Sequence, residues 1–421
     1  MLLYERASKT DNLSKDDLNT GLCAALDKLG SRKKVLAIPP DITRFYSQAG
    51  DLTQMAYKYF GSAMTDVLPA LGTHFAMTPA EIQRMFGNMP LELFKEHNWR
   101  DDLVTLGTVP AEFIKQISEE KLDFDWPAQV NTLLVKGGFD LILSIGQVVP
   151  HEVIGMANYN KNIFVGTGGS EGINKSHFLG AVYGMERIMG RANTPVRQVL
   201  NYASDNFARD LPIVYVQTVV ESTDNGPVMR GLFIGDDIEC FNKAADLSLE
   251  VNFHMLDKPL KKVVVYLDPH EFKSTWLGNK SIYRTRMAMA DQGELIVLAP
   301  GLKEFGEDPE IDKLISKYGY VGTDKVLQLV NENDDLKNNL GAAAHLIHGS
   351  TEGRFTVTYC PGHISREKIE SVNFLYDDLP TMLKCYNPDV LHDGINTVNN
   401  EEIFYISNPS MGLWAFKNRF I

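Results

Sequence analysis

The sequence predicts an α/β protein built from two domains. The chain has 421 residues, more than one typical hydrophobic core takes. Short apolar runs alternate with segments of helical periodicity, which is the pattern of βαβ units. This alternation restarts after residues 256–259 (LDKP), which places a boundary there. We therefore expect two α/β domains, residues 1–258 and residues 259–421, with a cofactor and substrate cleft between them.

The first domain should supply most of the parallel strands. Its predicted strands are apolar runs bounded by proline, glycine or aspartate. One ends at a double proline (KKVLAIPPD) and the next at a Pro-His pair. We expect strands at 33–41, 139–152, 161–170, 211–220 and 229–236, and a helix at 177–189.

The second domain repeats the same alternation on a smaller scale. Its strands carry dense valine, leucine and isoleucine, as in KKVVVYLD. We expect strands at 261–268, 293–301, 354–362 and 401–407, and helices at 281–292, 309–318, 323–348 and 364–372.

Composition limits the function classes. The net charge of −13 argues against a nucleic-acid-binding or anionic-membrane surface. We find no run of about 18 uncharged apolar residues, so no transmembrane helix is expected, and the start MLLYERASK lacks a signal-peptide core. The four cysteines are far apart and form no CxxC pair, as expected for reduced thiols. We expect a cytoplasmic protein with a small-molecule substrate.

Reactive side chains follow the first predicted strand. The segment PPDITR supplies Asp41 and Arg44. Ligands of open parallel sheets bind at the carboxyl ends of strands, and an arginine fork matches a carboxylate. The structural alternative is a helix cap by Asp41 with an Asp41–Arg44 ion pair.

A histidine precedes the next predicted helix. The segment LGTHFAMTPAEI places His74 in a short loop. Thr78, followed by Pro79 and Glu81, is a good helix start. A lone loop histidine is more often structural, so His74 matters only if it faces other reactive groups.

The segment from residue 150 to residue 177 is the richest in chemistry. It contains His151, Lys161 and His177 around the glycine turn GTGGSEG (166–172). Such a turn can offer backbone N–H groups to a phosphate. Glu171 breaks the pattern GxGxxG, and Asn174 breaks the P-loop pattern. A purely structural turn therefore remains open.

Zinc is an alternative use of these histidines. The motif HExxH is absent, because Val153, Ile154 and Gly155 follow His151-Glu152. The spacing of His74, His151 and His177 is too wide to be diagnostic of zinc. A zinc hydrolase with three histidine ligands stays open. His97 and His345 are expected to be structural or surface residues.

Taken together, PPDxTR, the GTH loop and PHxxxG followed by Lys161 and His177 resemble the nickel-pincer lactate racemase family. The match covers most of the chain, and the motifs lie in the N-terminal half. The resemblance implies a nickel ion held in a sulfur–carbon–sulfur pincer on a pyridinium mononucleotide, which other enzymes must build.

The resemblance also implies residue roles. Lys161 would carry the cofactor through a thioamide, and His177 would be the fourth nickel ligand. His74 and His151 would be the acid and base on opposite sides of the substrate. Arg44 would hold the substrate carboxylate. Asp41, beside Arg44, would contact the cofactor. The turn residues Thr167, Gly168 and Gly169 would hold its single phosphate.

This family chemistry inverts C2 of a 2-hydroxy acid. A base takes the hydroxyl proton while the C2 hydrogen leaves as hydride, giving a 2-keto acid, and return of the hydride to the other face inverts the centre. Two histidines, each with a pKa near neutrality, suit the two faces. A nicotinamide dehydrogenase would need a dinucleotide motif, which we do not find.

The sequence departs from lactate-specific members in the second domain. Those members carry a Tyr-Gln pair and a nearby lysine. Here Tyr283 fits, but Arg284 and Arg286 replace the Gln and Lys pattern, and Leu340 stands about where a tryptophan is expected. Extra guanidinium donors suit a larger, hydroxyl-rich acid, so we expect a sugar-acid epimerase acting on a substrate such as mannonate or gluconate. A solvated helix face is the structural alternative for both arginines.

Other functions remain open at this point. They are lactate racemase proper, a metal-dependent hydrolase or dehydrogenase with an unrecognised motif, and a non-enzymatic protein that binds nickel or the pincer cofactor.

Overall fold

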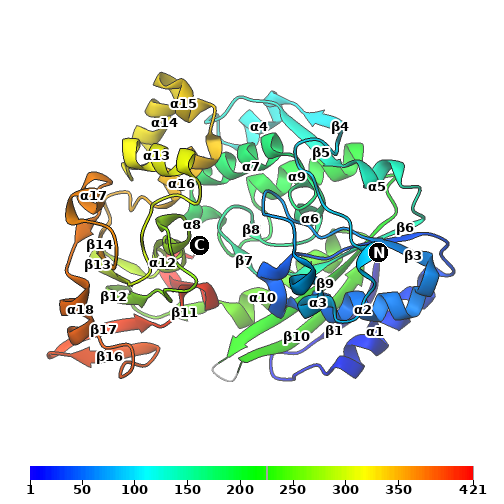
Figure 1. Ribbon diagram of the computed structural model, residues 1–421, viewed down its shortest axis with the longest axis horizontal. Coiled ribbons are helices and arrows are strands. Elements are labelled where there is room, and N and C mark those ends of the chain that lie inside the picture. Colours follow the sequence, from blue (N-terminus) through cyan, green and yellow to red (C-terminus); the bar gives the residue numbers. More distant parts are fainter. Residues whose placement is uncertain (224–225, 421) are drawn as a thin grey trace. The chain divides into compact units, whose positions relative to one another are not determined.

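The computed structural model describes residues 1–223 and 226–420 and confirms an α/β fold (Figure 1). Contacts divide the chain into two compact units. Unit 1 comprises Met1–Leu179 and Arg187–Asn252, and unit 2 comprises Gly180–Glu186 and Phe253–Ile421. The domain boundary that we expect after residue 258 stays a prediction.

Unit 1 is organised around a six-stranded sheet with the order β1-β10-β9-β6-β2-β3. The run β9-β6-β2-β3 is parallel, whereas β10 is antiparallel to both β1 and β9. All residues of β2 are buried, as a parallel strand covered on both faces requires. The strands are β1 (Leu2–Ala7), β2 (Val35–Ile38), β3 (Met64–Val67), β6 (Leu141–Gln147), β9 (Ile213–Thr223) and β10 (Gly226–Gly235).

Helices cover this sheet through their apolar sides. Leu22 of α1, Leu52 of α2 and Phe86 of α3 pack in one core cluster with strand residues such as Val35 and Leu143. The helices of this part of the chain are α1 (Lys15–Leu29), α2 (Ala49–Phe60), α3 (Pro79–Phe86), α4 (Ala111–Ile117), α5 (Thr132–Lys136), α6 (Asn160–Phe164), α7 (Ser170–Tyr183), α8 (Met185–Ile188), α9 (Pro195–Phe207) and α10 (Ile238–Asn252). A separate antiparallel pair joins β4 (Leu103–Val109) to β5 (Trp126–Asn131).

Two predictions in this part need correction. The strand predicted at 161–170 is wrong, because α6 and a turn occupy these residues. Asn162 explains the difference: its amide donates to the Ile38 carbonyl at 2.9 Å and to the Ser144 hydroxyl at 3.1 Å. The helix predicted at 177–189 begins earlier, as α7, and is interrupted before α8. The helix start at Thr78 is confirmed, with a capping box to Glu81.

Unit 2 contains the second sheet, with the order β15-β14-β13-β12-β17-β16. All neighbours pair in parallel except β16 and β17. Its strands are β12 (Leu260–Tyr266), β13 (Met289–Ala299), β14 (Phe355–Pro361), β15 (Leu375–Tyr376), β16 (Gly394–Val398) and β17 (Glu401–Ile406). A further parallel pair joins β11 (His254–Leu256) and β18 (Trp414–Phe416).

The bounds of one helix of unit 2 agree with the prediction, and those of other helices differ from it. α13 spans Pro309–Tyr318, as predicted, and Asp308 caps it. The helix predicted at 281–292 ends early, because β13 already starts at Met289 and pairs with Leu260 there. The helices are α11 (Thr275–Gly278), α12 (Lys280–Thr285), α13, α14 (Thr323–Glu332), α15 (Asp334–Lys337), α16 (Leu340–His348), α17 (Arg366–Ser371) and α18 (Leu379–Cys385).

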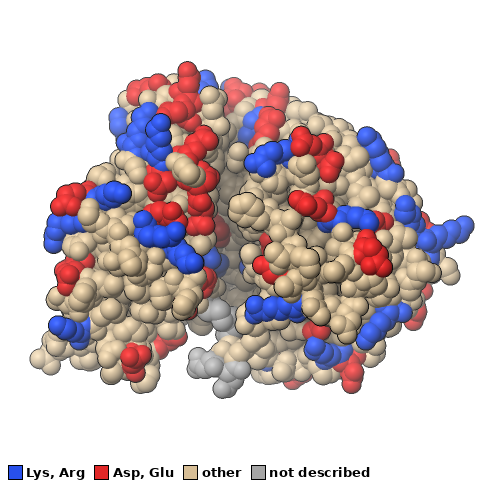
Figure 2. Space-filling view, in the orientation of Figure 1, with Lys and Arg blue, Asp and Glu red and all other residues tan. Residues whose placement is uncertain are grey.

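Charged side chains are spread over the surface. On the face drawn in Figure 2, basic and acidic side chains are interspersed, although the chain as a whole carries a net charge of −13. Within the described part of the chain, no helix combines the length and the apolar character that crossing a membrane needs.

Candidate active site

Three neighbouring strands of unit 1 lead into the reactive segments. β6, β2 and β3 are adjacent and parallel, so their carboxyl ends share one edge of the sheet. The chain leaves β2 toward Asp41 and Arg44, leaves β3 toward His74, and leaves β6 toward His151. This is the edge at which open parallel sheets bind ligands.

Asp41 links two of these segments. One carboxylate oxygen accepts the Thr43 N–H at 3.1 Å and caps the 3₁₀ helix η1 (Ile42–Ser47), and the other lies 2.7 Å from Nδ1 of His74. Burial would raise the pKa of Asp41, but hydrogen bonds from His74 and Thr43 outweigh burial and lower it. A carboxylate only accepts, so Nδ1 of His74 donates and Nε2 keeps the lone pair of a base.

Arg44 does not pair with Asp41, so the ion pair considered from sequence is not formed. Arg44 is partly buried and has an irregular backbone within η1, with φ of −112° and ψ of 33°. It makes no salt bridge with any residue of the described ranges 1–223 and 226–420. Its guanidinium can therefore take a carboxylate ligand without first breaking an internal ion pair.

His151 is buried beside the same edge. It lies in β7 (Pro150–His151), which pairs with β8 (Gly155–Met156), and is 8% exposed. Burial places the pKa of His151 well below its usual value; Glu152 opposes this, and the charges of Lys161, Arg44 and His177 add to it. The expectation of a pKa near neutrality is therefore wrong for His151.

The protonation of neutral His151 follows from its backbone contact. The N–H of Val153 donates to Nδ1 of His151 at 3.1 Å. In the neutral imidazole the hydrogen must then sit on Nε2. His74 and His151 thus differ at Nε2, where one carries a lone pair and the other a hydrogen.

Lys161 lies on α6 instead of a strand. Burial, together with the charge of Arg44 and against the opposing charge of Glu152, lowers the pKa of its amine to about 8. A substantial fraction of the amine is therefore neutral and nucleophilic near neutral pH. The charges of Lys161 and His177 lower the pKa of His151, and the charge of Lys161 lowers that of His177, so the structure brings these three residues near one another.

His177 is positioned by its own helix, α7. Its Nδ1 lies 2.7 Å from the Ile173 carbonyl. Because a carbonyl only accepts, Nδ1 donates and Nε2 presents its lone pair, as in histidines that ligate metals. Burial lowers the pKa of His177; the Ile173 carbonyl opposes this effect and Lys161 strengthens it.

Sequence reasoning missed Arg197, which supports α6 from α9. Arg197 is 1% exposed and has no carboxylate partner among the described residues. It donates to the carbonyl oxygens of Met156 at 2.7 Å and Asn158 at 3.2 Å, and to the Asn160 amide oxygen. Asn158 and Tyr159 have positive φ, 64° and 58°, which is uncommon outside glycine. Arg197 therefore fixes the irregular backbone that precedes Lys161.

The glycine turn is tightly packed. The backbone N–H groups of Thr167 and Gly168 donate to the carbonyl oxygens of Ile163 and Val165. A Cβ on Gly168 would lie 1.9 Å from the Phe164 carbonyl oxygen. These contacts give the turn a structural reason for its glycines, as the alternative above proposed. A role of Thr167, Gly168 and Gly169 in holding the cofactor stays a prediction.

His97, expected to be structural or on the surface, is buried and supports this turn. Its Nε2 donates to the Gly168 carbonyl at 3.0 Å, while Nδ1 contacts the Asn131 amide at 3.1 Å. Burial lowers the pKa of His97. The ring is therefore a satisfied core histidine.

Tyr283, Arg284 and Arg286 belong to unit 2. All three are buried, so a solvated helix face is wrong for the two arginines. Nε of Arg286 lies 3.2 Å from Glu186, and its Nη1 donates to the His348 carbonyl at 3.3 Å. Arg286 thus has protein partners of its own, and substrate binding by the three residues stays a prediction.

A zinc site with three histidines finds no support. Throughout residues 1–223 and 226–420, no three His, Cys, Asp or Glu side chains are grouped as ligands of one metal ion. A single histidine ligand, with the remaining ligands supplied by a cofactor, needs no such group.

Comparisons with known proteins agree with this geometry. Residues 18–187 match the model of the lactate racemase N-terminal domain, and this range contains the cluster from Asp41 to His177. No curated protein sequence matches the chain.

Two solved structures share the fold. A Thermotoga maritima protein is 26% identical, with a TM-score of 0.81, over 98% of this chain and 100% of that one. The lactate racemase apoprotein from Thermoanaerobacterium thermosaccharolyticum is 18% identical, with a TM-score of 0.71, over 98% of this chain and 94% of that one. The family match supports a racemase or epimerase activity in general terms. Residues 18–187 are thus similar to the N-terminal domain of lactate racemases, and the whole chain shares its fold with these two structures.

Proposed function

We propose that this chain is an epimerase that inverts C2 of a 2-hydroxy acid, with a sugar acid as its preferred substrate and a nickel-pincer nucleotide attached to Lys161. The observation that carries the proposal is the cluster around Lys161. The charges of Lys161, His177 and Arg44 lower the pKa of His151, and the charge of Arg44 also lowers that of Lys161. The charge of Lys161 in turn lowers the pKa of His177. All four residues lie in unit 1.

The residues present fit this cofactor. The lowered pKa of Lys161, about 8, gives the neutral amine that forming a thioamide requires. The lone pair on Nε2 of His177 suits nickel, for which imidazole is a good ligand. When bound, this cofactor would accept and return a hydride at C2 of the substrate.

The remaining work falls to side chains of this chain. Arg44 would bind the substrate carboxylate through its guanidinium fork. His74, with its lone pair on Nε2, would take the hydroxyl proton, and Asp41 would stabilise the imidazolium that forms. His151, neutral and with its hydrogen on Nε2, would donate a hydrogen bond to the substrate oxygen from the other side. The proton held by His74 would return to the substrate oxygen when C2 regains its hydrogen.

The preference for a sugar acid rests on unit 2. Tyr283, Arg284 and Arg286 are buried polar side chains at the positions that the family resemblance assigns to the substrate. Hydroxyl groups of a sugar acid could bond to such groups, whereas the methyl group of lactate could not. Sites built to hydrogen-bond a substrate reject analogues that lack the group by about 10⁴ or more.

The test is C2 deuterium exchange. The protein is produced together with enzymes that build the cofactor, and its loading is measured by intact mass and nickel content. We expect exchange with mannonate or gluconate, weak exchange with lactate, and none in Lys161→Ala. Lactate exchanging as fast as every aldonate would leave racemase chemistry standing but refute the sugar-acid preference.

A further inference from the structure

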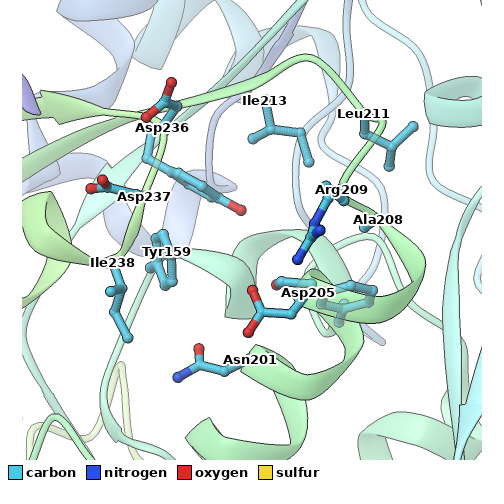
Figure 3. Close-up of a pocket in the computed structure, with 13 residues that line it drawn as sticks. Tyr159, Asn201, Asp205, Ala208, Arg209, Leu211, Ile213, Asp236, Asp237 and Ile238 are labelled. Carbon is cyan, nitrogen blue, oxygen red and sulfur yellow. The ribbon is translucent and has the colours of Figure 1, made fainter. Parts of the chain in front are cut away.

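Unit 1 contains a cavity that the catalytic proposal does not use. Figure 3 shows this cavity, whose volume is about 290 Å³, close to the lower limit of roughly 300 Å³ for small-molecule pockets. None of Asp41, Arg44, His74, His151 and His177 lines it. Its wall combines residues of α6, α9 and β9 with the end of β10, and its principal polar residues are Tyr159, Asn201, Asp205, Arg209, Tyr215 and Asp236.

Two tyrosine hydroxyls in this wall have no protein partner. Tyr159 and Tyr215 are 7% and 5% exposed, and both line the cavity. Neither hydroxyl forms a hydrogen bond to any residue in the part of the chain that the structure describes. Neither hydroxyl oxygen is among the fully enclosed polar atoms that lack a partner in the described residues, so both oxygens are open to the cavity, where a ligand can bond them.

Charged groups reach the same space. Figure 3 shows Asp205 and Arg209 directed into the cavity. Neither forms a salt bridge within residues 1–223 and 226–420. Asn201 contributes a side-chain amide. Its oxygen already accepts a hydrogen bond from Asn160 at 2.8 Å, which leaves its nitrogen as the donor. The cavity therefore presents an acceptor, a donor fork and an amide donor beside two aromatic rings.

This combination selects among ligand classes. An anion would meet the carboxylates of Asp205, Asp236 and Asp237. A cation would find Asp236 and Asp237 already paired with the Met1 ammonium. A neutral ligand with several hydroxyls can donate to Asp205, accept from Arg209, and bond both tyrosine hydroxyls.

We propose that this cavity binds a neutral polyhydroxylated molecule of monosaccharide size. The proposal does not depend on the reaction at Lys161. It does connect to α6, because Tyr159 precedes that helix, and the Asn160 amide donates to Asn201 at 2.8 Å and to Ser204 at 3.1 Å. A bound ligand should therefore slow amide hydrogen exchange in residues 159–165.

The test is calorimetric titration of the full chain with four probes at constant ionic strength: D-mannose, D-mannitol, D-mannonate and 1,4-diaminobutane. We expect binding of the two neutral probes. Tyr215→Phe and Asp205→Asn should each weaken it about tenfold or more, the loss expected for one hydrogen bond to a buried or charged partner. Asp210→Asn, which alters an exposed carboxylate outside the cavity wall, is the matched control and should bind as the wild type does.

Tyr215→Phe has a second readout that does not need a ligand. Without ligand it should unfold at the same or a higher temperature than the wild type, since it removes only an unpartnered hydroxyl. Binding of the diamine or of mannonate alone would overturn the assigned ligand class. Absence of binding by all four probes, or binding that Tyr215→Phe and Asp205→Asn leave unchanged, would overturn the site.

Discussion

The hydroxyl of Tyr283 donates a hydrogen bond to Nδ1 of His345, across 2.9 Å. The direction of this hydrogen bond follows from a series of contacts that begins at Thr275. Thr275 donates to the Phe305 carbonyl, so its oxygen accepts from Tyr320, whose own oxygen then accepts from Nε2 of His345. Neutral His345 has no second hydrogen, so Nδ1 must accept. The oxygen of Tyr283 can therefore only accept any further hydrogen bond.

Tyr283→Phe should destabilise unit 2. The substitution leaves Nδ1 of the buried His345 without its donor, which costs about 1–3 kcal/mol. The measurement is the free energy of unfolding in urea. Tyr46→Phe, at a side chain that is 60% exposed, is the control and should change this free energy little. Equal stability of the two variants would contradict the proposed direction of the contacts.

His345 should also make stability depend on pH. Burial lowers its pKa from 6.5 to about 3 in the folded state. The folded pKa lies below the unfolded one, so the stabilisation is complete above pH 6.5 and is lost as the pH falls from 6.5 toward about 3. The slope is at most about 1.4 kcal/mol per pH unit.

His345→Gln tests this, because glutamine can accept from Tyr283 and donate to Tyr320 without titrating. We expect a shallower fall of the unfolding free energy between pH 6 and pH 4 than in the wild type. His392→Gln, at an exposed position, should keep the wild-type slope. A His345→Gln slope equal to that of the wild type would show that His345 also titrates normally when folded.

The sequence was informative about reactive side chains that come directly after the ends of parallel strands. Asp41 and His74 were both predicted as site residues, and they lie 2.7 Å apart because the parallel neighbours β2 and β3 end at one edge. The short run that contains Lys161 was assigned to a strand because an apolar pattern of that length fits either element. Contacts of Asn162 with residues 38 and 144 decide for a helix, and these are remote in sequence.

Burial was the property that the sequence did not reveal. Arg197 lies in PVRQVLNYASDNF, where an arginine suggests a solvated face, yet it is nearly inaccessible. The low pKa of His151 also results from burial by distant segments. Both features depend on tertiary packing, which local patterns do not encode.

Lys161 of the cofactor-free protein should react unusually fast with an amine acylating reagent. With a pKa of about 8 instead of 10.5, the neutral fraction at pH 7 is larger roughly 100-fold or more. Peptide mass spectrometry after brief labelling gives the rate, with the exposed Lys33 as the internal control. A rate for Lys161 no higher than that for Lys33 at pH 7 would speak against a preformed nucleophile.

Nickel retention should separate the three histidines. His177→Ala should lose most of the nickel from cofactor-loaded protein, because it removes the proposed ligand nitrogen. His74→Ala and His151→Ala should retain it while losing activity. Metal analysis together with the intact mass of the Lys161 adduct distinguishes loss of nickel from loss of the whole cofactor. Equal nickel loss in all three variants would instead favour a shared site with three histidine ligands.

Asp41→Asn should deprive His74 of its carboxylate acceptor while keeping the helix start. Asparagine is also a good helix cap, so its amide oxygen should still accept the Thr43 N–H and η1 should keep its start. The oxygen that accepts from Nδ1 of His74 is replaced by an amide nitrogen, which only donates, so both this hydrogen bond and the negative charge beside the imidazolium are lost. We expect kcat to fall about 100-fold, within the range of about 10²–10⁴ that general base catalysis contributes.

The other measurements should stay close to the wild type. KM should change little, because Arg44 binds the substrate carboxylate, and nickel content should be retained, because His177 is untouched. Thr43→Val is the matched control: it removes a hydroxyl that donates to the same carboxylate but leaves the charge in place. A kcat for Asp41→Asn equal to that of Thr43→Val would show that the carboxylate charge does not assist His74, and the base would have to be sought elsewhere in the cluster.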